Sequence, residues 1–329
     1  MKIKIVEKLA PFSHLPGAAC VIPGTCWEVE AFPTLIRIGK HEIRLHLTGP
    51  VHDFTLQQDL ERHCVFVFGK AKEGYYKIRI EASDSGFDLA PEKGKVLKGK
   101  VHVAEEIQFV PKKDWERLSL GNHKSQDWDL VKKRCDLTEI LPLLFCLGQK
   151  IPRIPPQPLK GTARLLEMPE ERNELDAALK AFFKAAFKKI LVPRLIDDHM
   201  QGIVPEEDVK GDRFFLIQEG AKMVRGLFFK QNERRLGFLP HLPVSLHAGR
   251  MIGIKAPGIG EIDFEWSKKT LRSVIIRATT SGEVILELGK ELKTLRVRSS
   301  PREKGKRQSG TEPVLLAAGK TVYLDRFQK

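Results

Sequence analysis

The sequence has no long hydrophobic run. In its 329 residues no window approaches the roughly 18 uncharged apolar residues that a membrane-spanning helix requires, so we expect no membrane partner. The opening residues MKIKIVEKLAPF place Lys8 where a secretory signal needs an uninterrupted apolar stretch. The expected location is therefore the cytoplasm.

Cysteine is scarce and irregularly spaced. The cysteines are odd in number and form no CxxC pair, which argues against a disulfide framework and against a zinc ribbon. His63 stands beside Cys64, but this spacing matches no known zinc site. We expect reduced, buried thiols, no metal and no other cofactor. The cysteines are Cys20, Cys26, Cys64, Cys135 and Cys146.

Acidic residues are outnumbered, and the net charge is +14. Part of the excess lies in residues 296–308, RVRSSPREKGKRQ, with six basic residues and one Glu. Such a cluster favours anionic partners such as nucleic acid, or it keeps a sheet edge soluble. Because no aromatic residue is present here to stack on bases, nucleic acid is the less favoured partner. The candidate anion-binding residues are Arg296, Arg298, Arg302, Lys304, Lys306 and Arg307.

The first third of the chain has the pattern of short strands. At this length two or three domains are expected. The segments TLIRIG, EIRLHLTG, HCVFVFGK and YYKIRIEA alternate apolar and polar residues and are separated by glycines, as strands of a half-buried sheet do. The spacing leaves no room for crossover helices. We therefore predict an N-terminal antiparallel β-sandwich over residues 1–111.

Residues 112–235 change to a helical period, with a Pro-rich linker at 150–161. The linker holds four prolines and should be extended and stiff. A helix is predicted over 169–191, and a second from Asp212 to about Lys230. The first carries a wide apolar stripe, which we interpret as a face packed on the core. Its members are Leu175, Leu179, Phe182, Phe183, Ala186, Phe187 and Ile190.

Strand patterns return in residues 236–329, in GEIDFEW, LRSVIIRA, GEVILEL, KTLRVRS, PVLLAA and KTVYLDRF. They predict a C-terminal antiparallel β-sandwich, with Ile262, Phe264 and Trp266 on one face of their strand. The fold class is therefore α+β, with a short helical middle between two sandwiches.

The stretch 237–288 resembles a known family. A Leu-Pro-rich segment, Leu239 to Pro243, leads into a loop with Gly249 and Gly253, and then into a strand ending in Asp263 to Trp266. This order, and the closing AAGKTVYL, are similar to the junction between the last barrel helix and the C-terminal β-domain of glycoside hydrolase family 95 and its relatives.

The resemblance implies a scaffold in which a barrel of twelve helices holds the active site. Twelve helices of about 12 residues with connections of about 5 need roughly 200 residues, whereas residues 112–235 suffice for three to five helices. A complete barrel does not fit. The catalytic acid and base of the family lie in that barrel, and no stretch here accepts them.

The segment 120–129, LGNHKSQDWD, is a candidate ligand loop. Ser125 is a good N-cap, with Asp127 and Asp129 in the first helical turn, which favours a structural role. His123, Lys124 and Trp128 could instead present a stacking surface and donors to a sugar. Asp127 and Asp129 would diverge on a helix, so a hydrolytic pair of carboxyls would need a residue from outside the loop. The candidate ligand-binding residues are Asp114, Glu116, His123, Lys124, Gln126, Asp127 and Trp128.

These observations favour a non-catalytic protein that binds a carbohydrate or a protein partner on a glycoside-hydrolase-like scaffold. Two alternatives stay open. One is a reduced glycoside hydrolase acting on a glycan. The other is a protein that binds an anionic polymer through residues 296–308.

Overall fold

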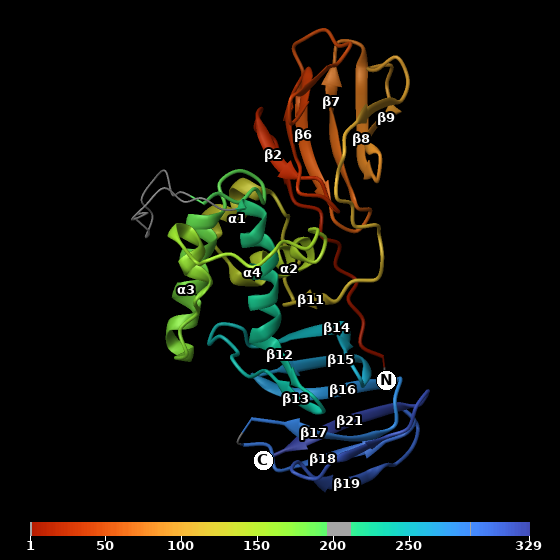
Figure 1. Cartoon of the computed structure of the whole chain (residues 1–329), viewed down its shortest axis with the longest axis vertical. Coiled ribbons are helices and arrows are strands. Elements are labelled where there is room, and N and C mark those ends of the chain that lie inside the picture. The colour runs from red at the N-terminus through yellow and green to blue at the C-terminus, as the bar shows by residue number, and fades with distance from the viewer. Residues whose placement is uncertain (1, 196–211, 290) are drawn as a thin grey trace.

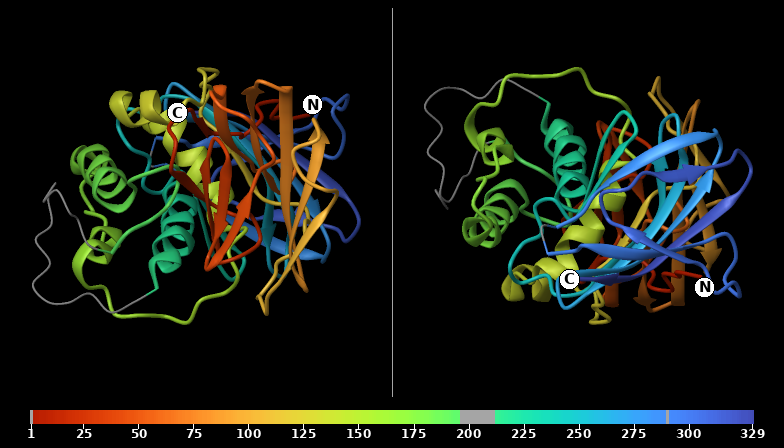
Figure 2. Two further views of the ribbon diagram at one scale, coloured as in Figure 1. Left: turned by 90° about the horizontal axis from the view of Figure 1, so that it is seen from above. Right: turned by 90° about the horizontal axis from the view of Figure 1, so that it is seen from below.

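The computed structural model describes residues 2–195, 212–289 and 291–329. Figure 1 shows a β part at the top, helices in the middle and a second β part below. Viewed along the long axis, the green helices lie to one side of the strands (Figure 2). Strands outweigh helices and no helical barrel is present in the described ranges, so the predicted α+β class is confirmed. None of the described helices combines the length and the apolar character that a bilayer crossing needs.

Two antiparallel sheets form the N-terminal part, as predicted. The smaller consists of β2 (Ala18–Val21), β3 (Glu28–Phe32), β4 (Leu35–Ile38) and β5 (His41–Arg44). The larger has the order β1-β6-β7-β8-β9-β10. Its strands are β1 (Phe12–Ser13), β6 (His52–Asp59), β7 (Cys64–Ala71), β8 (Gly74–Ser83), β9 (Gly86–Lys93) and β10 (Val101–Ala104).

Side chains from both sheets meet between them. Tyr76 Oη of β8 donates a hydrogen bond of 2.9 Å to the Pro33 carbonyl in the turn between β3 and β4. Trp27 packs edge-on against Phe87 of β9, with ring centroids 5.5 Å apart. Burial alternates along the strands, so that Ile36 and Ile38 are fully buried, as the sequence pattern predicts for a sheet with one face toward a core.

The helical middle contains four α-helices in the described part of the chain. Asp212 caps α4, accepting a hydrogen bond of 2.8 Å from Phe214 N, and the apolar stripe predicted for α3 is buried. The predicted end of α3 at 191 is wrong. Phe187 takes extended backbone, and Arg194 Nε bonds the Ala185 carbonyl at 2.9 Å, which closes the helix early. The helices are α1 (Trp128–Arg134), α2 (Leu137–Gly148), α3 (Arg172–Ala186) and α4 (Arg213–Phe228), with a 3-10 helix η1 at Gly161–Leu166.

Two close contacts fix α2 and the Pro-rich segment against α4. Gly148 lies so near α4 that a Cβ there would overlap Ala221 Cβ and the Ile217 carbonyl oxygen. The buried Gln218 accepts a hydrogen bond of 3.1 Å from Ile154 N and donates one of 2.9 Å to the Pro152 carbonyl. The linker has no regular secondary structure before η1.

Residues 117–119 form a strand where the sequence predicted a helix. This strand, β11 (Arg117–Ser119), pairs antiparallel with β14 (Gly249–Ala256). Its neighbours explain the error. Arg117 Nη2 reaches Glu61 Oε1 at 2.8 Å, and Ser119 Oγ reaches Glu7 Oε2 at 2.8 Å. Such contacts are distant in sequence, and three residues are too few to show a period of two.

Two sheets also form the C-terminal part. The larger, with the order β11-β14-β15-β16-β21-β18-β19, is antiparallel. The smaller, with the order β12-β13-β17-β20, includes one parallel pair, β13 with β17, so the fully antiparallel prediction is wrong for it. The remaining strands are β12 (Phe229–Asn232), β13 (Arg235–Phe238), β15 (Gly260–Ser267), β16 (Thr270–Ala278), β17 (Gly282–Glu287), β18 (Thr294–Arg298), β19 (Lys306–Ser309), β20 (Val314–Leu316) and β21 (Thr321–Gln328).

The segment expected to be a glycine-bearing loop is strand β14. Gly253 has φ +71° and lies at a register shift between Met251 and Ile254, so a bulge interrupts the alternation that would have revealed the strand. The three predicted inward residues of β15 are all buried. Phe264 stacks edge-on with Phe238 at 5.2 Å and Trp266 lies 5.1 Å from Phe228, which joins both sheets to α4.

The contact of α2 with α4 predicts opposite effects for two glycine substitutions. Gly148→Ala should lower the unfolding free energy by ~1–3 kcal/mol, because the helices must separate to admit the methyl group. Gly226→Ala is the control, since a Cβ there meets nothing within 4 Å; it should raise stability by up to ~1 kcal/mol through helix propensity. Thermal unfolding of the two variants measures both effects, and a stable Gly148→Ala protein would contradict the packing described.

Candidate functional site

A cavity lies where the N-terminal sandwich, the helices and the C-terminal sheet meet. It has two lobes that share Lys113, Asp114, Trp115 and Lys255 in their lining. The sheet lobe, of about 390 Å³, is bounded by residues of the sandwich, β11, β14, β15 and β16. The helix lobe, of about 720 Å³, is bounded by α2 and α4. We name the whole the junction cavity.

Trp115 lies at the centre of the junction cavity. Its ring is half-buried, and Lys150 Nζ and Lys113 Nζ lie 4.6 Å and 4.8 Å from the ring centroid. Ammonium groups at such distances are attracted to the π-face. The Nε1 donor is buried and has no acceptor in the described part of the chain. The indole therefore offers the cavity an aromatic surface.

Lys150 is a buried lysine that forms no direct ion pair with a carboxylate in the described part of the chain. It is 2% exposed and lines the sheet lobe, yet within the described ranges no ion pair reaches its Nζ. Burial lowers the pKa of Lys150, whereas the charge of the nearby Glu61 carboxylate raises it and the charge of Lys112 lowers it further. The backbone is held on both sides: Lys150 N donates to the Leu147 carbonyl and Gly24 N donates to the Lys150 carbonyl, both at 2.9 Å.

Most carboxylates that line the cavity form ion pairs with basic side chains of the protein. Glu116 Oε2 accepts from Arg225 Nε at 2.7 Å, and Glu116 Oε1 accepts from Lys255 N at 2.9 Å. Glu61 pairs with Arg117 at 2.8 Å.

The carboxylates that β15 contributes to the lining are also paired. Asp263 pairs with Arg277 at 2.5 Å, and this hydrogen bond raises the pKa of the Arg277 guanidinium. Glu261 pairs with Lys255 at 2.6 Å. Asp114 is exposed, and no cation pairs with it in the described part of the chain.

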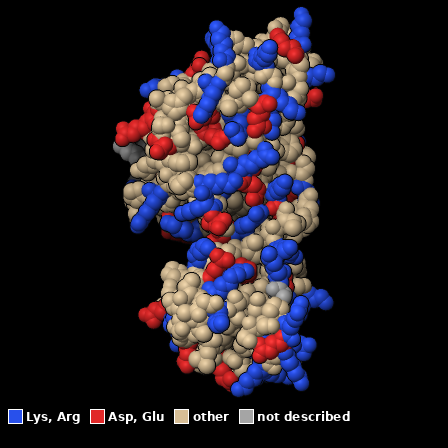
Figure 3. All heavy atoms as spheres, turned by 90° about the vertical axis from the view of Figure 1, so that its right-hand side faces the viewer, with Lys and Arg blue, Asp and Glu red and all other residues tan. Residues whose placement is uncertain are grey.

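The lining therefore has an excess of positive charge. Four lysines of the sheet lobe have no carboxylate partner among the described residues, whereas Asp114 is the sole unpaired carboxylate there. Figure 3 shows Lys and Arg side chains, with Asp and Glu among them, on both sides of the narrow waist between the upper and lower parts of the molecule. The four lysines are Lys2, Lys112, Lys113 and Lys150.

His63 packs near Trp115, with ring centroids 6.3 Å apart. It is 7% exposed and has φ +63°. Burial, together with the charges of Lys150 and Lys112, lowers the pKa of His63 to about 4. The imidazole is therefore neutral at physiological pH, and its uncharged ring fits beside the lysines.

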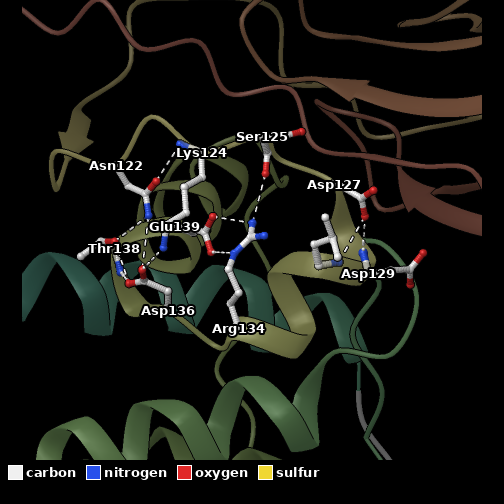
Figure 4. Close-up of polar contacts among 10 residues, drawn as sticks. Asn122, Lys124, Ser125, Asp127, Asp129, Arg134, Asp136, Thr138 and Glu139 are labelled. Carbon is white, nitrogen blue, oxygen red and sulfur yellow. Dashed lines mark hydrogen bonds and ion pairs between the residues drawn. The ribbon is translucent and has the colours of Figure 1, made fainter.

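The structure brings only two of the seven candidate ligand residues into this cavity. Asp114 and Glu116 line the helix lobe. The polar side chains of the loop at 120–129 instead form hydrogen bonds with the protein itself, as Figure 4 shows. The predicted N-cap at Ser125 is wrong: Asp127 caps α1, and its Oδ1 accepts from Asp129 N at 3.0 Å and Leu130 N at 3.2 Å.

The other residues of this loop fasten it to the fold. Lys124 Nζ pairs with Asp136 Oδ2 at 2.9 Å (Figure 4). Gln126 accepts from Ala10 N at 2.7 Å and donates to the Lys8 carbonyl at 2.8 Å. His123 is exposed; its charge lowers the pKa of Glu7, although burial raises that pKa more.

Trp128 lies in the core and not at the surface. It is 1% exposed and packs edge-on against Phe183 at 5.5 Å. Its ring therefore presents no stacking surface for a sugar. The aromatic residue shared by both lobes of the cavity is Trp115, which the sequence placed only at the start of a helical stretch. Lys150 was missed because a lysine beside a Pro-rich linker is ordinarily exposed.

The basic residues 296–308 form the hairpin β18–β19 at the edge of the larger C-terminal sheet. Arg296 Nε pairs with Asp325 Oδ1 at 2.7 Å, and Arg298 pairs with the other oxygen of the same carboxylate. Arg298 is 8% exposed. The other four candidates are exposed: Arg302, Lys304, Lys306 and Arg307.

No cluster of three or more His, Cys, Asp or Glu that could hold a metal ion occurs in the described part of the chain. The five cysteines are free, and all but the half-buried Cys26 are buried, which confirms the prediction of unpaired thiols.

Residues 231–322 match the family model of the glycoside hydrolase family 95, C-terminal domain. The matched segment runs from β12 to the start of β21, and it confirms the partial resemblance read from the sequence. It covers less than a third of the 329 residues. No curated protein matches the chain.

The ion pair of Glu116 with Arg225 predicts a large effect for Glu116→Gln. The variant should lose ~3 kcal/mol of unfolding free energy, because a guanidinium is left in a half-buried site without its carboxylate. The control Asp114→Asn removes an unpaired charge nearby and should stay within ~0.5 kcal/mol. Thermal unfolding compares them. Equal losses would show that Glu116 has no special part in stability.

Burial of His63 predicts a pH dependence of stability. Its pKa is about 4 in the fold against 6.5 for the free side chain, so the unfolded chain binds a proton that the fold rejects between these values. Stability should therefore be fully present above pH 6.5 and fall toward pH 4. His63→Asn tolerates the positive φ and does not titrate, so its stability should fall less over this range. Urea unfolding at pH 7 and pH 4.5 measures the difference; parallel losses would refute the assignment to His63.

Proposed function

We propose that the protein binds a carbohydrate in the junction cavity, without hydrolysing it, on a scaffold whose C-terminal domain is glycoside-hydrolase-like. The observation that carries this proposal is the half-buried Trp115 ring in the cavity, with Lys113 and Lys150 within 5 Å of its centroid. Sugars combine apolar C–H faces with polar edges. An indole beside fixed donors complements both properties.

The lack of hydrolysis is argued from the carboxylates. Glycoside hydrolysis needs one carboxyl that can give up a proton and a second across the substrate. In the described part of the lining, Glu61, Glu116 and Asp263 are each paired with a guanidinium, which occupies carboxylate oxygens that a substrate would have to reach. Asp114 alone remains without a partner. One carboxylate does not make a hydrolytic pair.

The basic hairpin supports the anionic-polymer alternative less well. Arg296 and Arg298 share the Asp325 carboxylate, so part of the charge that the sequence displays is neutralised. Of the exposed cations, Lys306 and Arg307 lie on β19, an edge strand of its sheet, and Arg302 and Lys304 lie in the turn that leads to it. Charged residues at such an edge prevent pairing with other chains, which accounts for them without a ligand.

A glycan-array screen with neutral and acidic oligosaccharides, followed by titration calorimetry on those that bind, tests the proposal. Trp115→Ala should weaken binding at least tenfold, equal to ~1.4 kcal/mol, because the stacking surface is lost. Tyr75→Ala is a matched control: Tyr75 is 47% exposed and also has a lysine, Lys93, near its ring. It should bind with unchanged affinity.

Two outcomes would end this proposal. One is the absence of binding to every glycan on the array. The other is unchanged affinity in the Trp115→Ala protein when its fold is intact by circular dichroism. Release of reducing sugar that disappears in the Asp114→Asn variant would instead support the reduced hydrolase.

A further inference from the structure

We infer that the junction cavity selects glycans carrying a negatively charged group, and that Lys150 is the residue that determines this selection. The inference rests on the proposed carbohydrate binding and adds the chemical class of the ligand. The charged group is a carboxylate, as in a uronic acid, or a sulfate ester, since both present oxygen acceptors and one negative charge.

The first argument is the uncompensated ammonium of Lys150. A buried charge is costly unless it is paired, and proteins normally place a carboxylate beside a buried lysine. Lys150 is 2% exposed, forms no direct ion pair in the described ranges, and feels only the longer-range charge of Glu61, which is itself paired with Arg117. Its contact is the face of Trp115, at 4.6 Å. A ligand anion would supply the missing countercharge.

The second argument is the electrostatic potential around Lys150. Arg117, Arg277 and Lys255 have their own carboxylates, so they contribute little net charge. Lys2, Lys112 and Lys113 have none in the described part of the chain and line the same lobe. A concave site lined by unpaired cations focuses a positive potential and attracts anions.

The third argument is that Lys150 and Trp115 lie close enough together to contact one ligand at the same time. The backbone of Lys150 is fixed by hydrogen bonds to Leu147 and Gly24 and its side chain is buried, so little conformational entropy is lost when a ligand engages it. Because Lys150 Nζ lies 4.6 Å from the centroid of the Trp115 ring, a sugar that packs on the part of this ring left open by the lysines would carry an acidic substituent close to the ammonium. Stacking and charge pairing would then occur in one binding event.

The test uses ligands that differ only in charge. Oligogalacturonate and its methyl ester share one backbone, and a sulfated oligosaccharide with its desulfated form distinguishes sulfate from carboxylate. The full-length protein should bind at least one acidic member more than tenfold tighter than its neutral counterpart. Lys150→Gln should abolish that preference, because it weakens binding of the acidic member by more than tenfold relative to any change for the neutral member. The control Lys320→Gln removes an exposed lysine outside the cavity and should keep the preference.

The Lys150 variants should fold normally, so a loss of binding preference can be assigned to the missing charge. Removing a buried ammonium without a partner should leave the melting temperature unchanged or raised, and Lys150→Met provides a second uncharged variant of similar length. If acidic and neutral members bind equally, the inference is overturned and the carbohydrate proposal stands. If no glycan binds, both fail. If inorganic sulfate binds as tightly as the acidic glycans and Trp115→Ala has no effect, the site is a simple anion site and the inference is overturned.

Discussion

The Glu116 carboxylate is the point on which the arrangement of the three parts depends. It accepts hydrogen bonds from Arg225 of α4 and from the backbone of Lys255 in β14, while Arg225 also donates to the Lys255 carbonyl at 3.0 Å. The chain leaving the N-terminal sandwich is thereby fixed to a helix and to the C-terminal sheet at once. Because a buried pair of this kind tolerates little misalignment, it also fixes the walls of the junction cavity.

Apolar packing also holds the three parts of the molecule together. Phe228 at the end of α4 stacks on Trp266, and Phe264 touches Phe238 of the smaller sheet. The hydrophobic core runs without interruption from the N-terminal sandwich through the helices to the C-terminal sheets. The cavity therefore lies between parts that share one core, and its shape is a property of the whole chain. Shared cores of this type resist relative motion more than small polar interfaces do.

Features with local causes could be predicted from the sequence, and features with distant causes could not. Alternation revealed the strands around Ile36 and Phe264, and the apolar stripe revealed α3. The burial of Lys150, in contrast, depends on Trp115 and Gly24, which are far from it in the chain. The loop at 120–129 showed the opposite error: its polar residues look like a ligand site in isolation, yet Asp127 serves as a cap and Trp128 packs on Phe183.

The Pro-rich segment between α2 and η1 shows how a long connection can be held by few bonds. Its four prolines have no backbone N–H to satisfy, and they restrict the chain before it folds. Ordering this strap therefore sacrifices less freedom than ordering a flexible connection of equal length. The side chain of Gln218 alone bonds three of its backbone groups, Ile151, Pro152 and Ile154. A glycine-rich segment of the same length would need many more hydrogen bonds and packing contacts to follow the same path.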